Sequence, residues 1–517
     1  MNAFFSNRIK WGLLPLLIVI AWFVMARYTF NSKLDLNGDN FYYYITATSL
    51  AQGQGYSDLS TIDASKTSVY PPGYPILMAP LRAVTDSIVA QKWLNELFVL
   101  VSLLLLYAIF LHLGMGTQLA FTAAVAGAFI PRLLHFSTMM MAESSALLSS
   151  VLAFYFLMKM LDEEKILRSK WFYLMLVSLI LNYHIRTQGL ALMVGIMAML
   201  LLCRKWAVAA CTAGGFVAGC IPWILRNKLL GLTNTRYFDM VMMANPWRPE
   251  EGMLTMGEAV KRFFETLKML IFNAVPNTTL PFLNVDPDDP TFNAGIILVG
   301  LITTALIIVG CIRFGRIGLA FLAYIAATLC LISCFSTPSG SRYITALLPI
   351  LMATEFIGLY QTLKWLFGLK WTNARIPALL LLPLLLLAKT DLKYEHELSN
   401  MKYNIPYAQY FEISKMLKKA PEGSIVCARK PQMSYLYSGL PTCSYLMTND
   451  HEKLVRDLLN NKVDYVIVDA LGFSSTPLYL IPAINEYSRF FKIVYQYKDT
   501  NTLLLFFDRG AAGEFLK

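Results

Sequence analysis

The stretch WGLLPLLIVIAWFVMARYTFNSKLDLNGDNFYYYITA (residues 11–47) joins a long apolar run to an aspartate at the start of an aromatic segment. The apolar run, Trp11 to about Phe30, follows two basic residues, is long for the core of a signal peptide and shows no small-residue cleavage site. It therefore predicts an uncleaved first transmembrane helix, with the aspartate just beyond its outer end.

The composition of the whole chain agrees with a membrane protein. Of its 517 residues, 56% are hydrophobic and only 15% are charged, which is too few charges for an ordinary soluble domain. Further runs of spanning length predict a polytopic α-helical protein with about 11 transmembrane helices. These runs lie near 94–113, 117–135, 141–160, 171–186, 188–203, 206–225, 292–311, 318–335 and 343–363, with a shorter one at 375–389.

The distribution of Lys and Arg predicts the orientation. With a cytoplasmic N-terminus, basic residues fall in successive inner loops, as the positive-inside rule requires. They are Arg8, Lys10, Lys165, Arg168, Lys170, Arg204, Lys205, Arg313, Arg316, Lys364, Lys370 and Arg375. These loops account for the net charge of +11, so no nucleic-acid partner is expected.

Three segments then face outward: a loop over 31–91, a second over 226–291, and everything after the membrane part. We expect a transmembrane domain over 1–388 and a soluble C-terminal α/β domain over 389–517. The elements expected in it are a helix near Tyr407–Lys418, the strand SIVCA, a helix opening at Asn449, and the strands VDYVIVD, FKIVYQY and TLLLFFD. If the short run 375–389 did not cross, this domain would be cytoplasmic.

Motif searches limit the chemistry. The chain has no C-x-x-C, H-E-x-x-H, P-loop or G-x-G-x-x-G pattern, which argues against structural zinc and against ATP- or dinucleotide-dependent chemistry. Of its eight cysteines, only Cys427 and Cys443 fall in the outer domain, and a disulfide between them stays open.

Polar residues of the membrane part gather at the predicted outer helix ends. Arginines bind phosphate through charge-assisted hydrogen bonds, and a carboxylate can accept the proton of an attacking group. Such a cluster suits a reaction on a lipid-linked anion, whereas a transporter more often buries these groups near the midplane. The cluster comprises Asp39, Glu96, Arg132, His135, Glu143, His184, Arg186, Gln188, Arg226, Asn227 and Arg342.

Asp39 has three interpretations. Asp35, Asn37 and Asp39 match the start of a calcium loop, but Asn40 replaces its glycine and Thr46 its glutamate, so we do not expect an EF-hand site. Asp39 or Asn40 could instead cap the helix FYYYITATSLAQ. The third interpretation is a catalytic carboxylate.

The stretch GDNFYYYITATSLAQGQGYSD, followed by VYPPGYPILMAPL, resembles the first outer loop of the GT-C glycosyltransferases. It is most similar to the protein-mannosyltransferase-like branch (glycosyltransferase family 39-like), which includes aminoarabinose transferases. Asp39, Tyr43, Pro71 and Pro72 fit the order of the family's acidic residue, tyrosine and Pro-Pro element. The resemblance continues in MAESSALL at Glu143, IRTQGLAL at Arg186, IPWILRN at 221–227 and SGSRYITALLPI at Arg342.

This resemblance implies inverting transfer of a sugar from a polyprenyl phosphate donor to a lipid, glycan or protein acceptor on the outer face of the membrane. Asp39 would accept the acceptor's proton. Arg342, Arg226 and Arg186 would bind the departing phosphate. Glu143 would orient the acceptor or, together with Asp39, hold a divalent metal ion, since some relatives use a metal and others do not.

One position departs from the pattern. Aminoarabinose-type relatives carry a lysine before the Pro-Pro pair, and here Tyr70 stands there; Lys66, four residues earlier, could replace it. The aromatic residues Tyr43, Tyr70 and Tyr74 have two interpretations, as a sugar-stacking surface or as interfacial anchors.

The style of the family implies a bacterial inner membrane with a periplasmic C-terminal domain. Two other classes stay open: a transporter or flippase of lipid-linked sugars, and a non-catalytic envelope scaffold, for which Asp39→Asn would be silent. The sugar, the acceptor, metal dependence and the oligomeric state do not follow from the sequence.

Overall fold

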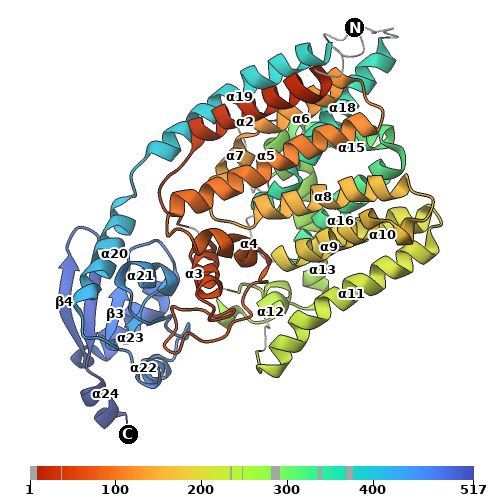
Figure 1. The fold of residues 1–517 in the computed structure, drawn as a ribbon. Coiled ribbons are helices and arrows are strands. Elements are labelled where there is room, and N and C mark those ends of the chain that lie inside the picture. The colour runs from red at the N-terminus through yellow and green to blue at the C-terminus, as the bar shows by residue number, and fades with distance from the viewer. Residues whose placement is uncertain are drawn as a thin grey trace.

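The computed structural model describes residues 9–36, 38–232, 236–246, 248–280, 291–335, 340–367 and 376–516. Helices form a bundle, and a small sheet follows at the C-terminal end (Figure 1). The bundle helices are α2 (Leu14–Thr29), α5 (Ile88–His112), α6 (Thr117–Ala126), α7 (Pro131–Ser137), α8 (Glu143–Leu161), α9 (Lys170–Ile185), α10 (Gly189–Leu202), α11 (Trp206–Leu229), α15 (Ala294–Arg313), α16 (Gly315–Ser333), α18 (Leu348–Leu366) and α19 (Ile376–Asn400).

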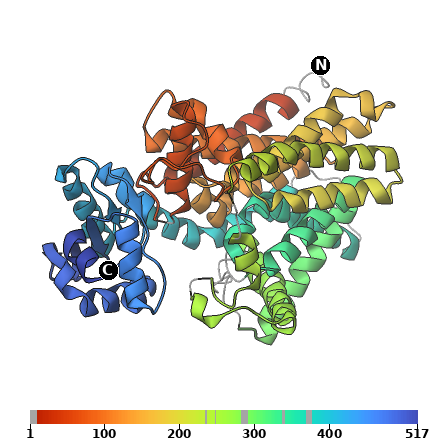
Figure 2. The same ribbon diagram turned by 90° about the horizontal axis from the view of Figure 1, so that it is seen from below.

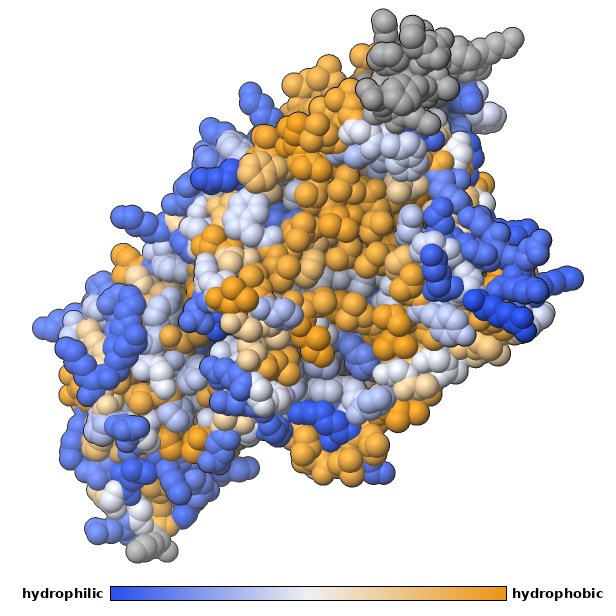
Figure 3. Space-filling view, in the orientation of Figure 1, coloured by the Kyte–Doolittle hydropathy of each residue, from blue (hydrophilic) through white to orange (hydrophobic). Residues whose placement is uncertain are grey.

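Seven helical segments among the described residues are long and apolar enough to cross a membrane, and an eighth results if the pair Thr117–Phe129 and Pro131–Ser137, bent by 62°, is one span. α9 and α10 have only 16 and 14 residues. The count of about 11 therefore stays a prediction, whereas the polytopic helical architecture is confirmed. An apolar belt covers the bundle face in view, and polar side chains dominate the C-terminal domain (Figure 3).

α15 and α18 approach each other closely in the bundle. A methyl group added at Gly310 would overlap the carbonyl oxygen of Thr354, and one at Gly358 would overlap that of Leu306. Small residues allow such close backbone approach between membrane helices, where van der Waals packing replaces the hydrophobic effect as the driving force. The close packing of α15 against α18 therefore fixes the position of α18 and of the residues just before it.

Short helices connect the bundle helices, and the first two of them lie next to the C-terminal domain (Figure 1). Each belongs to one of the two predicted outer loops or to a helix end. They are α3 (Asp39–Ala51), α4 (Gly73–Arg82), α12 (Arg236–Met242), α13 (Met256–Met269), α14 (Val275–Thr279) and α17 (Gly340–Tyr343).

The C-terminal domain contains a five-stranded sheet in the order β2-β1-β3-β5-β4. β1 pairs in parallel with β2 and β3, while β5 pairs antiparallel with β3 and β4. The strands are β1 (Val426–Cys427), β2 (Thr442–Cys443), β3 (Tyr465–Val468), β4 (Phe491–Tyr497) and β5 (Thr502–Phe507), and the helices are α20 (Ile405–Met416), α21 (Pro431–Ser438), α22 (His451–Asn460), α23 (Ile481–Glu486) and α24 (Arg509–Phe515).

Two details of this domain differ from the sequence expectation. Asp450, not Asn449, caps α22, because its side chain accepts a hydrogen bond from Lys453 N. The expected domain boundary at 388/389 falls inside α19, which is one continuous helix. Cys427 and Cys443 are register partners in the parallel pair β1–β2, and both are free thiols.

The C-terminal domain lies against the first outer loop in both views (Figure 1 and Figure 2). Thr442 N, at the edge strand β2, donates to Ser60 O at 2.6 Å. Gln432 Nε2 donates to Asp58 Oδ2 at 3.2 Å, and Tyr403 OH donates to Leu34 O at 2.9 Å. The domain is thus attached to the loop that carries Asp39.

Candidate active site

Asp39 is the first residue of α3. The preceding Gly38 has a φ of 97°, and no side chain caps the helix. Its side chain points into the site: Oδ1 accepts a hydrogen bond from Tyr70 OH at 2.7 Å, and Oδ2 accepts one from Arg342 Nη2 at 2.7 Å. The cap interpretation of Asp39 stays a prediction. Asn40 Oδ1 accepts from Gly38 N, which lies outside the helix.

Glu143 is the first residue of α8, and its side chain is 1% exposed. Its Oε1 forms ion pairs with Arg186 Nη1 at 2.5 Å and with Arg342 Nε at 3.0 Å. Arg342 thus donates to both Asp39 and Glu143, which are 104 positions apart in the sequence. One guanidinium group joins the two carboxylates that the sequence singled out.

The two arginines reach the site from two different helix ends. Arg186 follows the last residue of α9, and Arg342 lies in the short helix α17 just before α18. Both guanidinium groups lie over the ring of Tyr343, with centroid distances of 5.2 and 5.8 Å. A cation over an aromatic face is held by the ring quadrupole, so Tyr343 helps to fix both arginines.

These groups line a cleft with about 680 Å³ of empty space. Part of its wall is polar and part is apolar, as suits a ligand with a charged group and a hydrocarbon chain. The lining residues are Asp39, Tyr43, Val69, Tyr70, Pro71, Ile185, Arg186, Thr187, Gln188, Met240, Phe335, Arg342 and Tyr343.

Tyr43 and Tyr70 form the aromatic side of the cleft. Their ring centroids are 5.2 Å apart. Burial raises the pKa of Tyr43 well above its usual value of 10.0, so its hydroxyl is neutral near pH 7 and available as a donor. A neutral phenol on the wall of a cleft can both stack against a ligand and donate a hydrogen bond to it.

The remainder of the Pro-Pro element has a packing role. Pro72 precedes α4 and adopts helical backbone angles. Tyr74 is fully buried, its ring makes an edge contact with Tyr43, and its hydroxyl donates to Asn95 Oδ1 at 3.1 Å. Tyr74 therefore packs behind Tyr43, while Tyr70 and Pro71 line the cleft and Pro72 is not among its lining residues.

Two predicted phosphate ligands lie elsewhere. Arg226 donates to Thr67 O at 3.0 Å and to Tyr56 O at 2.9 Å, and its guanidinium lies 4.9 Å from the Trp223 ring centroid. Lys66 Nζ donates to backbone and side-chain oxygens of the same loop, Gln54 O at 2.5 Å and Ser57 Oγ at 3.0 Å. Both side chains hold the loop between α3 and α4, and their role toward phosphate stays a prediction.

The alternative of a divalent metal ion between Asp39 and Glu143 does not match this geometry. Arg342 already lies between the two carboxylates, and Arg186 adds a second cation on Glu143. Across the described ranges, no group of three or more His, Cys, Asp or Glu side chains is placed to hold a metal ion. Of the calcium-loop pattern, Asp35 pairs with Lys92 at 2.7 Å, and Asn37 lies outside the described residues.

Sequence reasoning missed several lining residues. Tyr343 directly follows Arg342, and this Arg-Tyr pair was the available signal for it. Met240 and Phe335 had no such signal, because an apolar side chain near a helix end looks the same whether it lines a cleft or faces lipid.

No protein-family model matches the chain, and no curated protein matches it. Solved structures do share its fold. The oligosaccharyltransferase AglB from Archaeoglobus fulgidus, tethered to an acceptor peptide, matches with a TM-score of 0.59 at 11% identity, over 96% of this chain and 74% of AglB. ArnT from Cupriavidus metallidurans, bound to undecaprenyl phosphate, matches with a TM-score of 0.58 at 13% identity, over 96% of this chain and 98% of ArnT.

Another AglB structure, in complex with an inhibitory peptide and a dolichol-phosphate, matches with a TM-score of 0.57 at 11% identity, over 96% of this chain and 74% of AglB. The similarity includes the helical bundle and the C-terminal domain alike, since it covers nearly the whole chain. The expected architecture is therefore confirmed. This chain therefore shares its fold with the oligosaccharyltransferase AglB and with ArnT.

Proposed function

We propose that this protein is an inverting glycosyltransferase that moves a sugar from a polyprenyl phosphate to an acceptor on the outer face of a membrane. The observation that carries the proposal is the bridge made by Arg342 between Asp39 and Glu143 in an open cleft. Two solved structures with this fold hold lipid-linked phosphates, undecaprenyl phosphate in ArnT and a dolichol-phosphate in AglB.

In this reaction an acceptor oxygen bonds to the anomeric carbon while the bond from that carbon to the phosphate oxygen breaks. The acceptor's proton passes to Asp39, and the electron pair of the broken bond leaves with the polyprenyl phosphate. Because the phosphate is already a competent leaving group, the site needs a base more than an acid. Base catalysis of this kind typically contributes about 10²- to 10⁴-fold.

The positive groups of the cleft suit the departing phosphate. Arg186 and Arg342 lie on its wall and present planar N–H donors that match phosphate oxygens. Donors that are already fixed stabilise charge that grows in the transition state without reorganisation at that moment. Glu143 holds both arginines in place through its Oε1. We assign it this role rather than that of a metal ligand.

The apolar wall suits the lipid chain of the donor. Val69, Ile185, Met240 and Phe335 line the same cleft as the arginines. A phosphate held by arginines would then place its first isoprene units along these side chains. The proposed setting is a bacterial inner membrane with the C-terminal domain in the periplasm, where a lipid, a glycan or a protein would be the acceptor.

The test is release of free polyprenyl phosphate, measured by mass spectrometry, when purified protein is incubated with lipid and envelope extracts of its host. Wild-type protein should release it, and Asp39→Asn should lower the rate by about 10²- to 10⁴-fold. Asp63→Asn, an exposed aspartate of the same outer loop, is the matched control and should behave as wild type. The mass of the consumed donor would narrow the sugar class.

A transporter gives a different outcome in the same extract. If the protein consumes no donor although polyprenyl-phosphate sugars are present, but moves them across a vesicle bilayer, the transferase proposal fails and the flippase interpretation replaces it. Donor consumption that Asp39→Asn leaves unchanged would retain a transferase and remove Asp39 as its base.

A further inference from the structure

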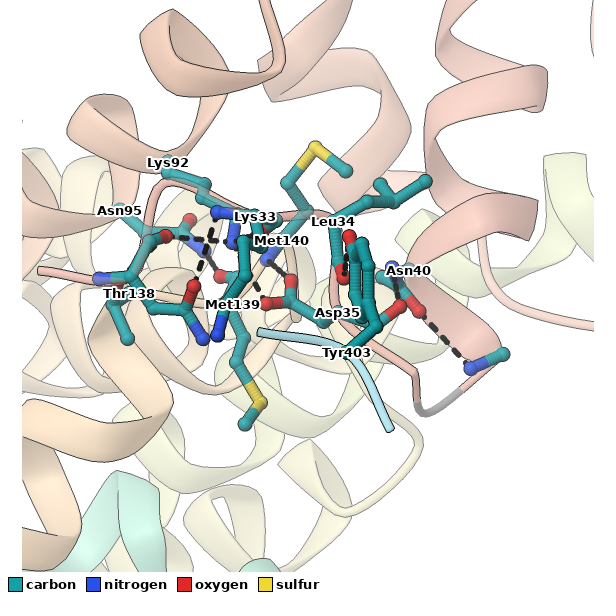
Figure 4. A network of polar contacts seen from close by, with 12 residues as sticks. Lys33, Leu34, Asp35, Asn40, Lys92, Asn95, Thr138, Met139, Met140 and Tyr403 are labelled. Carbon is teal, nitrogen blue, oxygen red and sulfur yellow. Dashed lines mark hydrogen bonds and ion pairs between the residues drawn. The ribbon is translucent and has the colours of Figure 1, made fainter. Parts of the chain in front are cut away.

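The segment between α2 and α3 leads directly into Asp39. The residues described before that aspartate form no helix or strand, so neighbouring elements must fix the backbone position at which α3 begins. Figure 4 shows polar side chains gathered around this segment from several parts of the chain. Asn31 N donates to Thr138 Oγ1 at 2.8 Å, and Tyr403 OH donates to Leu34 O.

Lys92 on α5 makes the densest set of these contacts. Its side chain is 0% exposed, and its ammonium group donates to Asn31 O at 2.9 Å, to Lys33 O, and to Asp35 Oδ1 at 2.7 Å. An ammonium group has three N–H donors, and these three oxygens use all of them. Lys92 therefore fixes three points along five residues of the segment.

Asp35 connects this segment to the other catalytic element. Its second oxygen, Oδ2, accepts a hydrogen bond from Met140 N at 3.2 Å, and its main-chain oxygen accepts Asn40 Nδ2 at 3.0 Å. Met140 lies in the turn that leads into Glu143, at the start of α8. Asp35 thus lies on the approach to Asp39, and its buried carboxylate bonds the approach to Glu143.

Asn95 completes the arrangement from the same face of α5, since it lies three positions after Lys92. Its Nδ2 donates to Met139 O and, at 3.2 Å, to Met141 O. Two adjacent side chains of a single helix therefore hold the two approaches, one each, and Asp35 joins them (Figure 4). None of the three lines the cleft.

A buried ion pair is a poor means of stabilising a fold, because desolvation of both charges offsets their attraction. It does impose a definite geometry, since each charge must meet specific partners. We propose that Lys92 and Asp35 are a positioning pair that sets the spacing between Asp39 and Glu143, so that Arg342 can bridge them. The kinetic part of this inference rests on the proposed function; the spacing itself does not.

Two variants test the pair. Lys92→Met removes the ammonium group and keeps an unbranched chain, and Asp35→Asn keeps two polar atoms but removes the charge. Glu395→Gln is the matched control, because Glu395 pairs with His135 at 2.8 Å between α19 and α7 and does not line the cleft. Each protein is compared with wild type by amide hydrogen exchange and by donor turnover.

The positioning role predicts a local and paired effect. Exchange should become at least about tenfold faster in both 34–47 and 139–147 in each variant, while β3 and β5 keep wild-type protection. The kcat for polyprenyl phosphate release should fall by about 10- to 10²-fold, as expected for a misplaced catalytic group, with KM within about twofold. Glu395→Gln should change neither quantity.

Two results would overturn the inference. Wild-type exchange in both segments of both variants would show that the pair does not hold them, and faster exchange throughout the chain would show a general loss of stability. Because exchange needs no substrate, it still decides the positioning role if the proposed transfer reaction is absent. If transfer occurs and both segments loosen while kcat is unchanged, the spacing does not matter for catalysis and the positioning role fails.

Discussion

Arg342 Nη2 lies 2.7 Å from Asp39 Oδ2 although the two residues are 303 positions apart in the chain. Arg342 Nε lies 3.0 Å from Glu143 Oε1 at the same time. The planar guanidinium group makes this double contact possible, because its N–H donors point in different, fixed directions.

The first prediction concerns Arg342→Lys. A lysine ammonium group is a compact charge and cannot reproduce the forked contact with Asp39 and Glu143. We expect kcat/KM for polyprenyl phosphate release to fall by about 10²-fold, the usual scale for a lost charge-stabilising donor. Arg489→Lys, on the surface of the C-terminal domain, is the matched control. Wild-type kinetics in Arg342→Lys would mean that charge alone suffices.

The second prediction concerns stability. Glu143→Gln removes the charge that partners Arg186, while Arg342 keeps its pair with Asp39, and breaking a buried ion pair by removing one partner costs about 3–5 kcal/mol. We expect a clear fall in the midpoint of thermal unfolding in detergent. Glu412→Gln breaks the exposed pair with Lys415 and should cost no more than about 1 kcal/mol. Equal midpoints for the two variants would contradict the buried network.

The third prediction separates two neighbouring tyrosines. Tyr70→Phe removes the hydroxyl that donates to Asp39 at 2.7 Å, and a hydrogen bond to a charged group is worth about 1.5–3 kcal/mol. Turnover should fall by roughly 10- to 10²-fold with little change in the unfolding midpoint. Tyr74→Phe leaves the buried Asn95 oxygen without its donor and should lower the midpoint instead. If Tyr70→Phe lowered the unfolding midpoint and Tyr74→Phe lowered turnover, the roles assigned to the two tyrosines would be wrong.

The fourth prediction concerns metal removal. Arg342 already lies between the two carboxylates. Chelation of metal ions with EDTA should therefore leave the rate of transfer within about twofold of the rate of the untreated protein, a change of less than about 1.4 kcal/mol in activation free energy. The measurement is polyprenyl phosphate release before and after treatment, with Mg²⁺ or Zn²⁺ added back. A large loss that one of these ions restores would show that the arginine moves aside for a metal.

The sequence was sufficient to bring together four side chains of the site. Asp39, Glu143, Arg186 and Arg342 were assigned to one face of the membrane from helix ends and loop charges, and the structure places all four in one network. This worked because topology alone decides on which side a helix end lies.

Arg226 and Lys66 show the limit of that reasoning. Each bonds to oxygens of the first outer loop, and Arg226 does so 159 positions away. A long side chain chooses among several acceptors within its reach, and sidedness does not distinguish them. Likewise, β2 has only two residues and no alternating pattern that a sequence could reveal.

The bridge between Asp39 and Arg342 also has a consequence for biosynthesis. A growing chain that has reached Glu143 and Arg186 still lacks the arginine that completes the site. Tyr403 and Gln432, which attach to the first outer loop, are synthesised later still. In the proposed reaction, competence should therefore appear near the end of translation, so that a partly inserted nascent chain would not consume the donor.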